Sequence, residues 1–239
     1  MAGVDSSIGN GWHDGNYRVC ATNELGQKVK LIAYSRDSEE LIKECGITSR
    51  GKTIINKSAS EFVDNLVKWD HESPLEHAVA TIRFEGVSRV FTHQLVRHRL
   101  SSITQESQRF SSVDVIVDGY VIPKSIQDDP NLLESFVKYV NEGMILYKSF
   151  IKKVGKDDAR YILPECLSCS IVITANLREW MTILRARLAP EAHWEIRGLM
   201  NIVACLLYSY VSRSVFKDFI TSDMLDNYLK LEKEEEFVK

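Results

Sequence analysis

Apolar residues recur along this chain with two spacings, which predict strands and helices. Runs typical of strands, alternating or β-branched, occupy residues 28–34, 78–86 and 170–174. Helical spacing, with apolar residues three and four apart, is found in residues 38–45, 58–69, 87–96 and 130–155 and in the segments that follow Asn176 and Pro190. No internal repeat and no Gly/Ser-rich linker divides the chain. The pattern therefore predicts a single catalytic α+β domain over residues 25–239, with an antiparallel or mixed sheet and several long helices.

Three sequence signals place helix starts. Ser58 and Glu61 have the spacing of a capping box, and Asn176 and Glu179 repeat it. Asp129-Pro130 supplies an N-cap followed by a proline in the first helical position. Each signal stands directly before an amphipathic stretch. The predicted helix starts therefore agree with the helical spacing of the apolar residues.

Three other segments give different expectations. Residues 1–24, which are rich in Gly, Ser, Asn and Asp, predict a mobile N-terminal tail. Residues 113–123 are β-branched around Asp118-Gly119, which predicts a hairpin or two short strands. The last ten residues, KLEKEEEFVK, predict a charged helix that frays.

Composition is that of an ordinary soluble protein, with 44% hydrophobic and 26% charged residues in a chain of 239. A net charge of −3 and a pI near 6.1 argue against general nucleic-acid binding, which leaves a basic footprint. No run of 18 apolar residues predicts a membrane span, and the first residues lack the apolar core of a signal peptide. We therefore expect a cytoplasmic protein that binds neither nucleic acid nor a membrane.

Five cysteines, an odd number without a framework spacing, are expected to be reduced thiols. Cys166 and Cys169 form a C-x-x-C pair, which could be a redox dithiol or half of a zinc site. No second C-x-x-C or H-x₃₋₅-H completes a zinc site, and the pair precedes a strand rather than opening a helix. We favour cysteines of the core.

Residues 89–110 are basic in an otherwise acidic protein. They carry four arginines and two histidines against one acid, with hydroxyl and amide side chains between them. The guanidinium fork matches phosphate and carboxylate oxygens, and Ser, Gln and backbone N–H groups can complete such a cradle. The segment follows the helix predicted at 87–96 as a polar loop, so we expect it to bind an anion such as a phosphate ester. A solvated charged loop is the alternative.

Arg187 lies on the apolar side of the helix that follows Asn176. At 100° per residue it falls within about 20° of Trp180, whereas Arg178 and Arg185 point away. A buried guanidinium needs an acceptor, because an unpaired buried charge is costly. A core carboxylate or a ligand could provide it.

The serine and arginine spacing of residues 97–109, RHR-x-x-S-x-x-x-x-S-x-R, resembles the signature of the flavin-dependent thymidylate synthases. HESPLEHA at 71–78 is similar to the H-x-[ST]-P-x-E-H segment of that family, and HWEIR at 193–197 to its QWEIR. The resemblance runs from about Trp69 to Glu195. It implies methylation of dUMP to dTMP, with FAD, NADPH and 5,10-methylenetetrahydrofolate, in a homotetramer whose sites combine residues of neighbouring subunits.

The resemblance also implies roles for individual residues. The expected dUMP ligands are Gln94, Arg97, Gln105, Glu106, Ser107, Gln108, Arg109, Arg160 and Arg187. The expected FAD ligands are Ser73, Arg97, His98, Arg99, Gln105, Asn176, Arg178 and Thr182, with Ser49 as a further flavin contact. Arg187 would be the catalytic residue, which activates the uracil electrostatically without a protein nucleophile. Ser107 has no neighbouring base to activate it and is assigned to the phosphate.

The chain departs from the family pattern at Glu191 and His193, where many relatives have His and Gln. Thr182 stands where some members have Asn, and the first 57 residues align poorly. A non-catalytic nucleotide- or nucleic-acid-binding protein that uses the basic segment remains an alternative. A metal enzyme built on His71, His77, His93 and His98 with Glu72 and Glu76 is another, although it lacks a familiar zinc motif.

Overall fold

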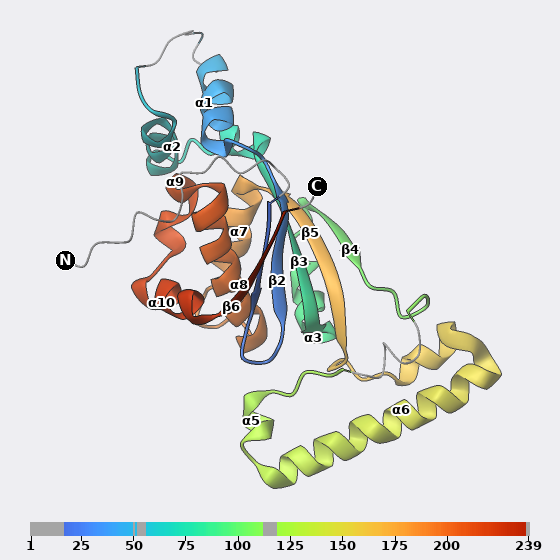
Figure 1. Cartoon of the computed structure of the whole chain (residues 1–239). Coiled ribbons are helices and arrows are strands. Elements are labelled where there is room, and N and C mark those ends of the chain that lie inside the picture. The colour runs from blue at the N-terminus through green and yellow to red at the C-terminus, as the bar shows by residue number, and fades with distance from the viewer. Residues whose placement is uncertain (1–16, 50, 52–55, 112–118, 238–239) are drawn as a thin grey trace.

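The computed structural model describes residues 17–49, 51, 56–111 and 119–237 (Figure 1). Its centre is a six-stranded antiparallel sheet in the order β4-β5-β3-β2-β1-β6. The strands are β1 (Tyr17–Thr22), β2 (Lys28–Tyr34), β3 (Val79–Ser88), β4 (Ser101–Gln105), β5 (Ser168–Asn176) and β6 (Glu232–Phe237). The predicted single α+β fold is confirmed, and its sheet is antiparallel throughout.

The helices fall into three groups along the chain. The first is α1 (Ser38–Thr48), α2 (Ala59–Lys68), the 3-10 turn η1 (Ser73–His77) and α3 (Arg89–Leu95). The second is α5 (Lys124–Gln127), α6 (Pro130–Ala159) and η2 (Arg160–Ile162). The third is α7 (Leu177–Arg187), α8 (Trp194–Leu206), the π-helical turn η3 (Leu207–Val211), α9 (Arg213–Phe216), η4 (Lys217–Phe219) and α10 (Ser222–Lys230). None of the described helices combines the length and apolarity needed to cross a bilayer.

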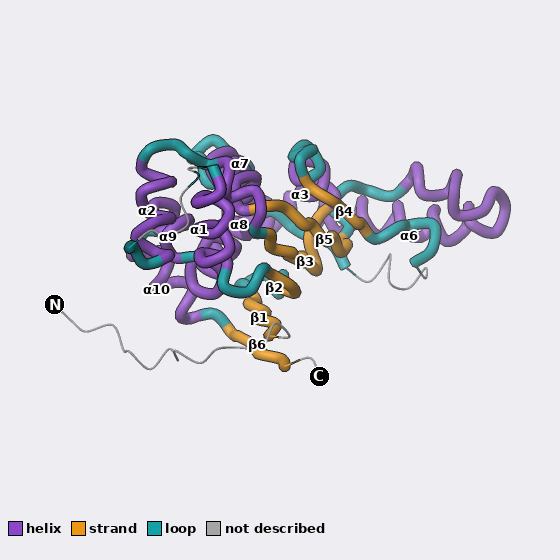
Figure 2. The backbone as a smooth tube through the Cα atoms, turned by 90° about the horizontal axis from the view of Figure 1, so that it is seen from above, coloured by secondary structure: helices purple, strands orange, loops and turns teal. Residues whose placement is uncertain are grey.

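One face of the sheet is covered by α7, α8, α9 and α10 (Figures 1 and 2). Strand β5 alternates strictly, so that Cys169, Ile171, Ile173 and Ala175 point into this core. Trp180 of α7 is fully buried there, and its indole N–H donates to the carbonyl of Ala80 on β3 at 3.0 Å. The apolar residues of these strands and helices therefore meet in one continuous core.

Helix starts follow the sequence signals. At α2 the capping box is complete, because Ser58 accepts from the backbone N–H of Glu61 and the Glu61 carboxylate accepts from that of Ser58. Asp129 caps α6 and Asn176 caps α7. Gly155 interrupts α6 with a φ of +76°, where the sequence places the end of that helix.

Four expectations at the margins are wrong or only partly tested. Strand β1 occupies residues 17–22 of the predicted tail, and β6 replaces the charged C-terminal helix because residues 232–237 pair with β1. β4 takes five residues of the predicted polar loop. The first half of the hairpin predicted at 113–123 lies outside the described residues; in the second half, Tyr120 makes one isolated bridge to Leu167.

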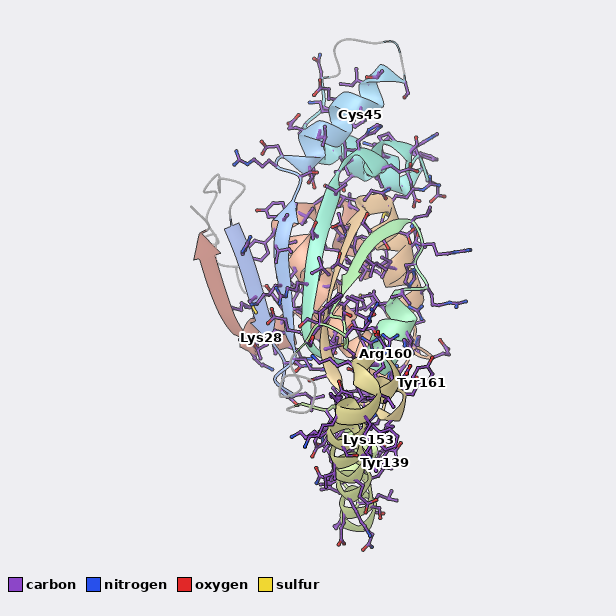
Figure 3. All side chains as sticks on the ribbon, turned by 90° about the vertical axis from the view of Figure 1, so that its right-hand side faces the viewer. Lys28, Cys45, Tyr139, Lys153, Arg160 and Tyr161 are labelled. Carbon is purple, nitrogen blue, oxygen red and sulfur yellow. The ribbon has the colours of Figure 1, made fainter. Side chains whose placement is uncertain are left out.

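Helix α6 projects away from the sheet as an arm (Figures 1 and 2). The helical stretch before the interruption at Gly155, residues 130–154, spans roughly 37 Å. A small second core forms where the arm joins the body, around Val140, Met144, Tyr147, Ala159 and Leu167. Figure 3 shows Arg160 and Tyr161 at this junction, with Tyr139 and Lys153 farther along the arm.

A buried carboxylate ties α3 to the sheet and to α8. Glu195 is 2% exposed, and its Oε1 accepts from the Gln27 side chain and from the backbone N–H of Ser88, both at 2.9 Å. The Ser88 hydroxyl donates to the other Glu195 oxygen and caps α3 through the backbone N–H of Phe91. This network fixes the start of the helix that leads into the basic segment.

We expect Glu195→Ala to destabilise the protein by about 3 kcal/mol, because it leaves the buried donors of Gln27 and Ser88 without their charged acceptor. Urea denaturation measures the change in the free energy of unfolding. The control is Glu24→Ala at an exposed turn position, which should cost less than about 0.5 kcal/mol. Equal values for the two variants would contradict the role given to Glu195.

Candidate active site

Five residues of the basic segment form β4 at an edge of the sheet, and the arginines lie before and after this strand. Ser101 to Gln105 pair in antiparallel register with Ala175 to Ile171. Since β5 runs directly into α7, the residues before β4 lie beside the start of α7. The residues after β4 lie at the other end of the strand, roughly 13 Å away for four extended intervals. The predicted ligand residues are therefore divided between two ends of β4.

Arg97, His98 and Arg99 connect α3 to β4 in a tight turn. The backbone N–H of His98 donates to the carbonyl of Leu95 at 3.2 Å, and the Ser101 hydroxyl donates to the carbonyl of His98 at 2.5 Å. Arg97 and Arg99 are exposed, while the His98 side chain is 10% exposed. Neither arginine has a carboxylate partner in the described part of the chain, so both present unneutralised charge at the surface.

Arg187 reaches this turn from the last residue of α7. Its Nε donates to Nε2 of His98 at 3.0 Å, and its Nη2 donates to the carbonyl of Gln94 at 2.8 Å. Burial lowers the pKa of Arg187, which nevertheless stays a cation at neutral pH. No carboxylate pairs with it among the described residues, so the structural ion pair that the sequence left open is not found. The guanidinium is held by neutral acceptors and keeps its charge available.

His98 is neutral near pH 7. Burial, and next the charge of Arg187, lower the pKa of His98 to about 4. Its Nδ1 lies 3.8 Å from Oε1 of Glu179, a side chain that is 8% exposed and whose pKa burial raises. The turn thus packs an arginine, an imidazole and a carboxyl group together.

Three of the other residues predicted to bind flavin, Ser73, Asn176 and Arg178, lie around the start of α7. Asn176 accepts from the backbone N–H of Glu179 at 2.8 Å, and Ser73 is exposed on η1, which packs against α7. Arg178 is exposed and pairs with Glu76 at 2.5 Å and with Glu72 at 3.4 Å. These residues and the RHR turn lie at the same end of the sheet.

Thr182 and Ser49 bind backbone carbonyls of their own helices. The Thr182 hydroxyl donates to the carbonyl of Arg178 at 3.2 Å, and Ser49 follows α1 and donates to the carbonyl of Gly46 at 2.8 Å. Neither hydroxyl has a recorded contact with the RHR turn in the described chain. Their flavin contacts stay predictions.

At the other end of β4, Gln105 and Glu106 point into the protein. Gln105 Nε2 donates to the Thr92 hydroxyl at 2.8 Å. The carboxylate of Glu106 accepts from the Ser111 hydroxyl at 2.8 Å and from the backbone N–H of Ser170 at 3.0 Å. In this arrangement both side chains hold the end of the strand in place, and each Glu106 oxygen keeps a further lone pair with which it can accept from a ligand.

Arg109 and Arg160 converge on Asp157 at the end of α6. Arg109 Nε lies 2.5 Å from the Asp157 carboxylate, and Arg160 Nε donates to the Asp157 carbonyl at 3.2 Å. Ser107 is adjacent, since its hydroxyl accepts from the backbone N–H of Arg109 at 3.3 Å. Gln108 lines a small pocket with Glu106, Leu167, Ser168 and Cys169. This end of β4 therefore gathers two guanidinium groups and a hydroxyl.

The chain is similar in sequence to proteins of a known family. Residues 30–210 match a family model described as thymidylate synthase complementing protein. A flavin-dependent thymidylate synthase of Clostridium tetani is 35% identical over 204 residues, which are 74% of this chain and 80% of that protein. Those of Pyrococcus abyssi and Pyrococcus furiosus are 39% and 38% identical over 181 residues, which are 71% of this chain and 74% of each relative. The chain belongs to the flavin-dependent thymidylate synthase family.

Family membership confirms the resemblance drawn from the signature. The alternative of a metal enzyme has no candidate site among the described residues, because they contain no group of three His, Cys, Asp or Glu side chains arranged to hold an ion. The thiols of Cys166 and Cys169 are free, and burial raises the pKa of each. They pack into the cores, as the sequence indicated, and do not have the lowered pKa of redox thiols.

Two neighbours of the site were missed by the sequence interpretation. Glu179 was explained as a helix-start residue, which hid its contact with His98. Asp157 stands in a charged stretch without a distinguishing pattern. His193 is one of the two positions at which the chain departs from the family pattern. The centroid of its ring lies 5.3 Å from that of Trp194, and its buried Nδ1 has no hydrogen-bond partner within the described chain.

The lowered pKa of His98 has a consequence for stability. Between about pH 4 and 6.5 the unfolded chain binds a proton at His98 that the folded chain does not, so this residue makes the free energy of unfolding rise with pH across that window. Urea denaturation at several pH values should show a smaller rise in His98→Gln. His71→Gln, at an exposed position, is the control and should keep the wild-type slope. An unchanged slope in His98→Gln would refute the burial of a neutral imidazole.

Proposed function

We propose that this chain is a flavin-dependent thymidylate synthase that converts dUMP to dTMP, with 5,10-methylenetetrahydrofolate as carbon donor and NADPH as reductant. The family match and the names of the relatives support the reaction. The contact of Arg187 with the RHR turn is the observation that carries the proposal, because it joins the one inward-facing arginine of α7 to the basic segment.

The residues at the start of α7 fit FAD. The exposed cations of Arg97, Arg99 and Arg178, with the Ser73 hydroxyl and the Asn176 amide, supply the donors that a pyrophosphate and a flavin ring need. We assign His98, Gln105 and Thr182 to the same cofactor. FAD, once reduced by NADPH, supplies the electrons that turn the transferred carbon into a methyl group.

Arg187 would act on the uracil. Its partners His98 and Gln94 are neutral, so its positive charge is not cancelled by the protein. A fixed cation in a half-buried place stabilises negative charge that develops on the pyrimidine edge during attack by C5. No serine or cysteine nucleophile is needed for this activation.

The phosphate of dUMP would bind at the other end of β4. Arg109, Arg160 and Ser107 provide two guanidinium groups and a hydroxyl, and the ester must compete with Asp157 for Arg109. The proposed dUMP set is completed by Gln94, Arg97, Gln105, Glu106 and Gln108. Glu106 contributes in part by holding the end of β4 in place.

The distance along β4 favours a site shared between subunits. Arg187 contacts the turn before β4 and Arg109 follows the other end of β4, and the strand between them spans roughly 13 Å. A homotetramer in which the RHR end of one subunit faces the Arg109 end of another would bring these arginines closer together.

Helix α6 offers a surface for this assembly. Leu132, Tyr139, Leu146 and Phe150 lie within about 40° of one another around the helix. Each is between 43% and 60% exposed, although all four are large and apolar. A long apolar stripe on a projecting helix is typical of an oligomer interface.

We expect Arg187→Ala to bind FAD, visible in the flavin absorption bands, and to lose dTMP formation by a factor on the order of 10² to 10³. NADPH oxidation and dTMP production, each measured with and without dUMP, test the function itself. Arg213→Ala, at an exposed site on α9, is the control and should keep wild-type turnover. Wild-type protein that takes up no FAD and makes no dTMP, or binds an oligonucleotide more tightly than dUMP, would instead support the non-catalytic alternative.

The assembly gives a separate prediction. Leu146→Glu puts a charge into the apolar stripe of α6 and should shift the protein from tetramer to smaller species in analytical ultracentrifugation. Ile145→Glu is the matched control, because its side chain is 68% exposed and points about 100° away from Leu146 around the same helix. If Leu146→Glu and Ile145→Glu both sediment as tetramers, this stripe of α6 is not part of the interface.

A further inference from the structure

Glu179 is a buried carboxyl group for which the proposed reaction has no use. Its residue is 7% exposed, and its backbone N–H binds the cap of α7. At α2 the Glu61 side chain completes a capping box. Among the described residues, the Glu179 side chain does not do so at α7 and lies beside His98 instead. No lysine or arginine of the described chain pairs with it. Burying a carboxyl group without a cationic partner costs free energy, so we asked what the buried position of Glu179 contributes.

The proton on His98 is fixed by its neighbours. A guanidinium N–H can only donate, so the contact with Arg187 requires a lone pair on Nε2 of His98. A neutral imidazole then carries its proton on Nδ1, the nitrogen that lies 3.8 Å from Oε1 of Glu179. At 3.8 Å this is an electrostatic contact longer than a hydrogen bond, and a carboxyl oxygen there favours hydrogen on Nδ1 in either protonation state of Glu179.

The opposite tautomer would break the contact with Arg187. With hydrogen on Nε2, two N–H donors would face each other across 3.0 Å. The Arg187 donor at Nε2 disfavours that tautomer, and the carboxyl oxygen of Glu179 near Nδ1 adds to the preference for the other. The charged groups around the ring are Glu179 and Arg187 from α7 and the flanking Arg97 and Arg99; α3 contributes the neutral Gln94.

We propose that Glu179 is a positioning residue that holds the proton of His98 on Nδ1 and thereby fixes the guanidinium of Arg187. With Nε on His98 and Nη2 on the carbonyl of Gln94, Nη1 is the nitrogen without a partner among the described residues. The fixed geometry aims this nitrogen at a ligand. The identity of that ligand rests on the proposed function; the tautomer does not.

Two variants and one spectroscopic measurement test the tautomer. Glu179→Leu removes the acceptor at similar volume, and Glu179→Gln keeps a carbonyl oxygen for the Nδ1 proton. Histidine-selective ¹⁵N spectra of the FAD-bound protein, with His98 assigned through His98→Gln, separate protonated from unprotonated ring nitrogens. We expect hydrogen on Nδ1 in the wild type and Glu179→Gln, and hydrogen on Nε2 in Glu179→Leu.

Turnover gives the second readout. We expect Glu179→Leu to lower kcat/KM for dUMP by a factor on the order of 10 to 10², because the guanidinium of Arg187 is no longer held in one orientation. The FAD content should be unchanged. Glu179→Gln should stay within about threefold of the wild type, and Glu24→Gln at the exposed turn is the matched control.

The outcomes separate this proposal from the function it builds on. Hydrogen on Nδ1 in Glu179→Leu, or a wild type with hydrogen on Nε2, would overturn the positioning role even if dTMP forms normally. Loss of turnover in Glu179→Gln equal to that in Glu179→Leu, with FAD retained, would also overturn it. A wild type with the expected tautomer that makes no dTMP would support the tautomer and overturn the proposed function.

Discussion

The antiparallel pairing of β4 with β5 is the constraint on which the candidate site depends. Asn176 is both the last residue of β5 and the cap of α7, so any segment paired with the end of β5 is carried to the first turn of that helix. Ser101 pairs with Ala175, and the RHR turn therefore lies within reach of α7 side chains. The hydrogen bonds between Arg187 and His98 follow from this register. A slip of one residue would turn the β4 side chains to the other face of the sheet.

Where α7 meets the RHR turn, the protein binds the positive charge of Arg187 without neutralising it. Arg187 is held by an imidazole nitrogen and a backbone carbonyl, two acceptors with lone pairs but no net charge. A carboxylate in the same place would bind the guanidinium more strongly and would also cancel the field that a substrate could feel. The buried network of Glu195, Gln27 and Ser88 contributes indirectly, because it anchors the start of α3, whose last turn presents the carbonyl of Gln94.

The sequence predicted the elements whose signal is local and missed those that depend on distant partners. The complete capping box of Ser58 and Glu61 and the inward position of Arg187 follow from spacing along one helix. β4 and β6 could not be predicted this way, because their residues are polar or charged and become strands through pairing with β5 and β1. Asn176 and Glu179 show the limit within one motif. Asn176 and Glu179 are three residues apart, as Ser58 and Glu61 are. The side chain of Glu179 nevertheless lies beside His98, which is 81 positions away in the sequence.

The position of β4 at the border of the sheet has a consequence for the molecule as a whole. An edge strand offers a row of backbone N–H and C=O groups to any other extended chain, and proteins guard such rows with charge or cover. At the opposite border, the sequence of β6 contains four glutamates in six residues, which is the charge that edge strands commonly carry. β4 has serines and a threonine in its place, and its arginines stand only outside the strand. Any molecule that binds against this border would also shield the sheet from growing by the addition of a foreign strand.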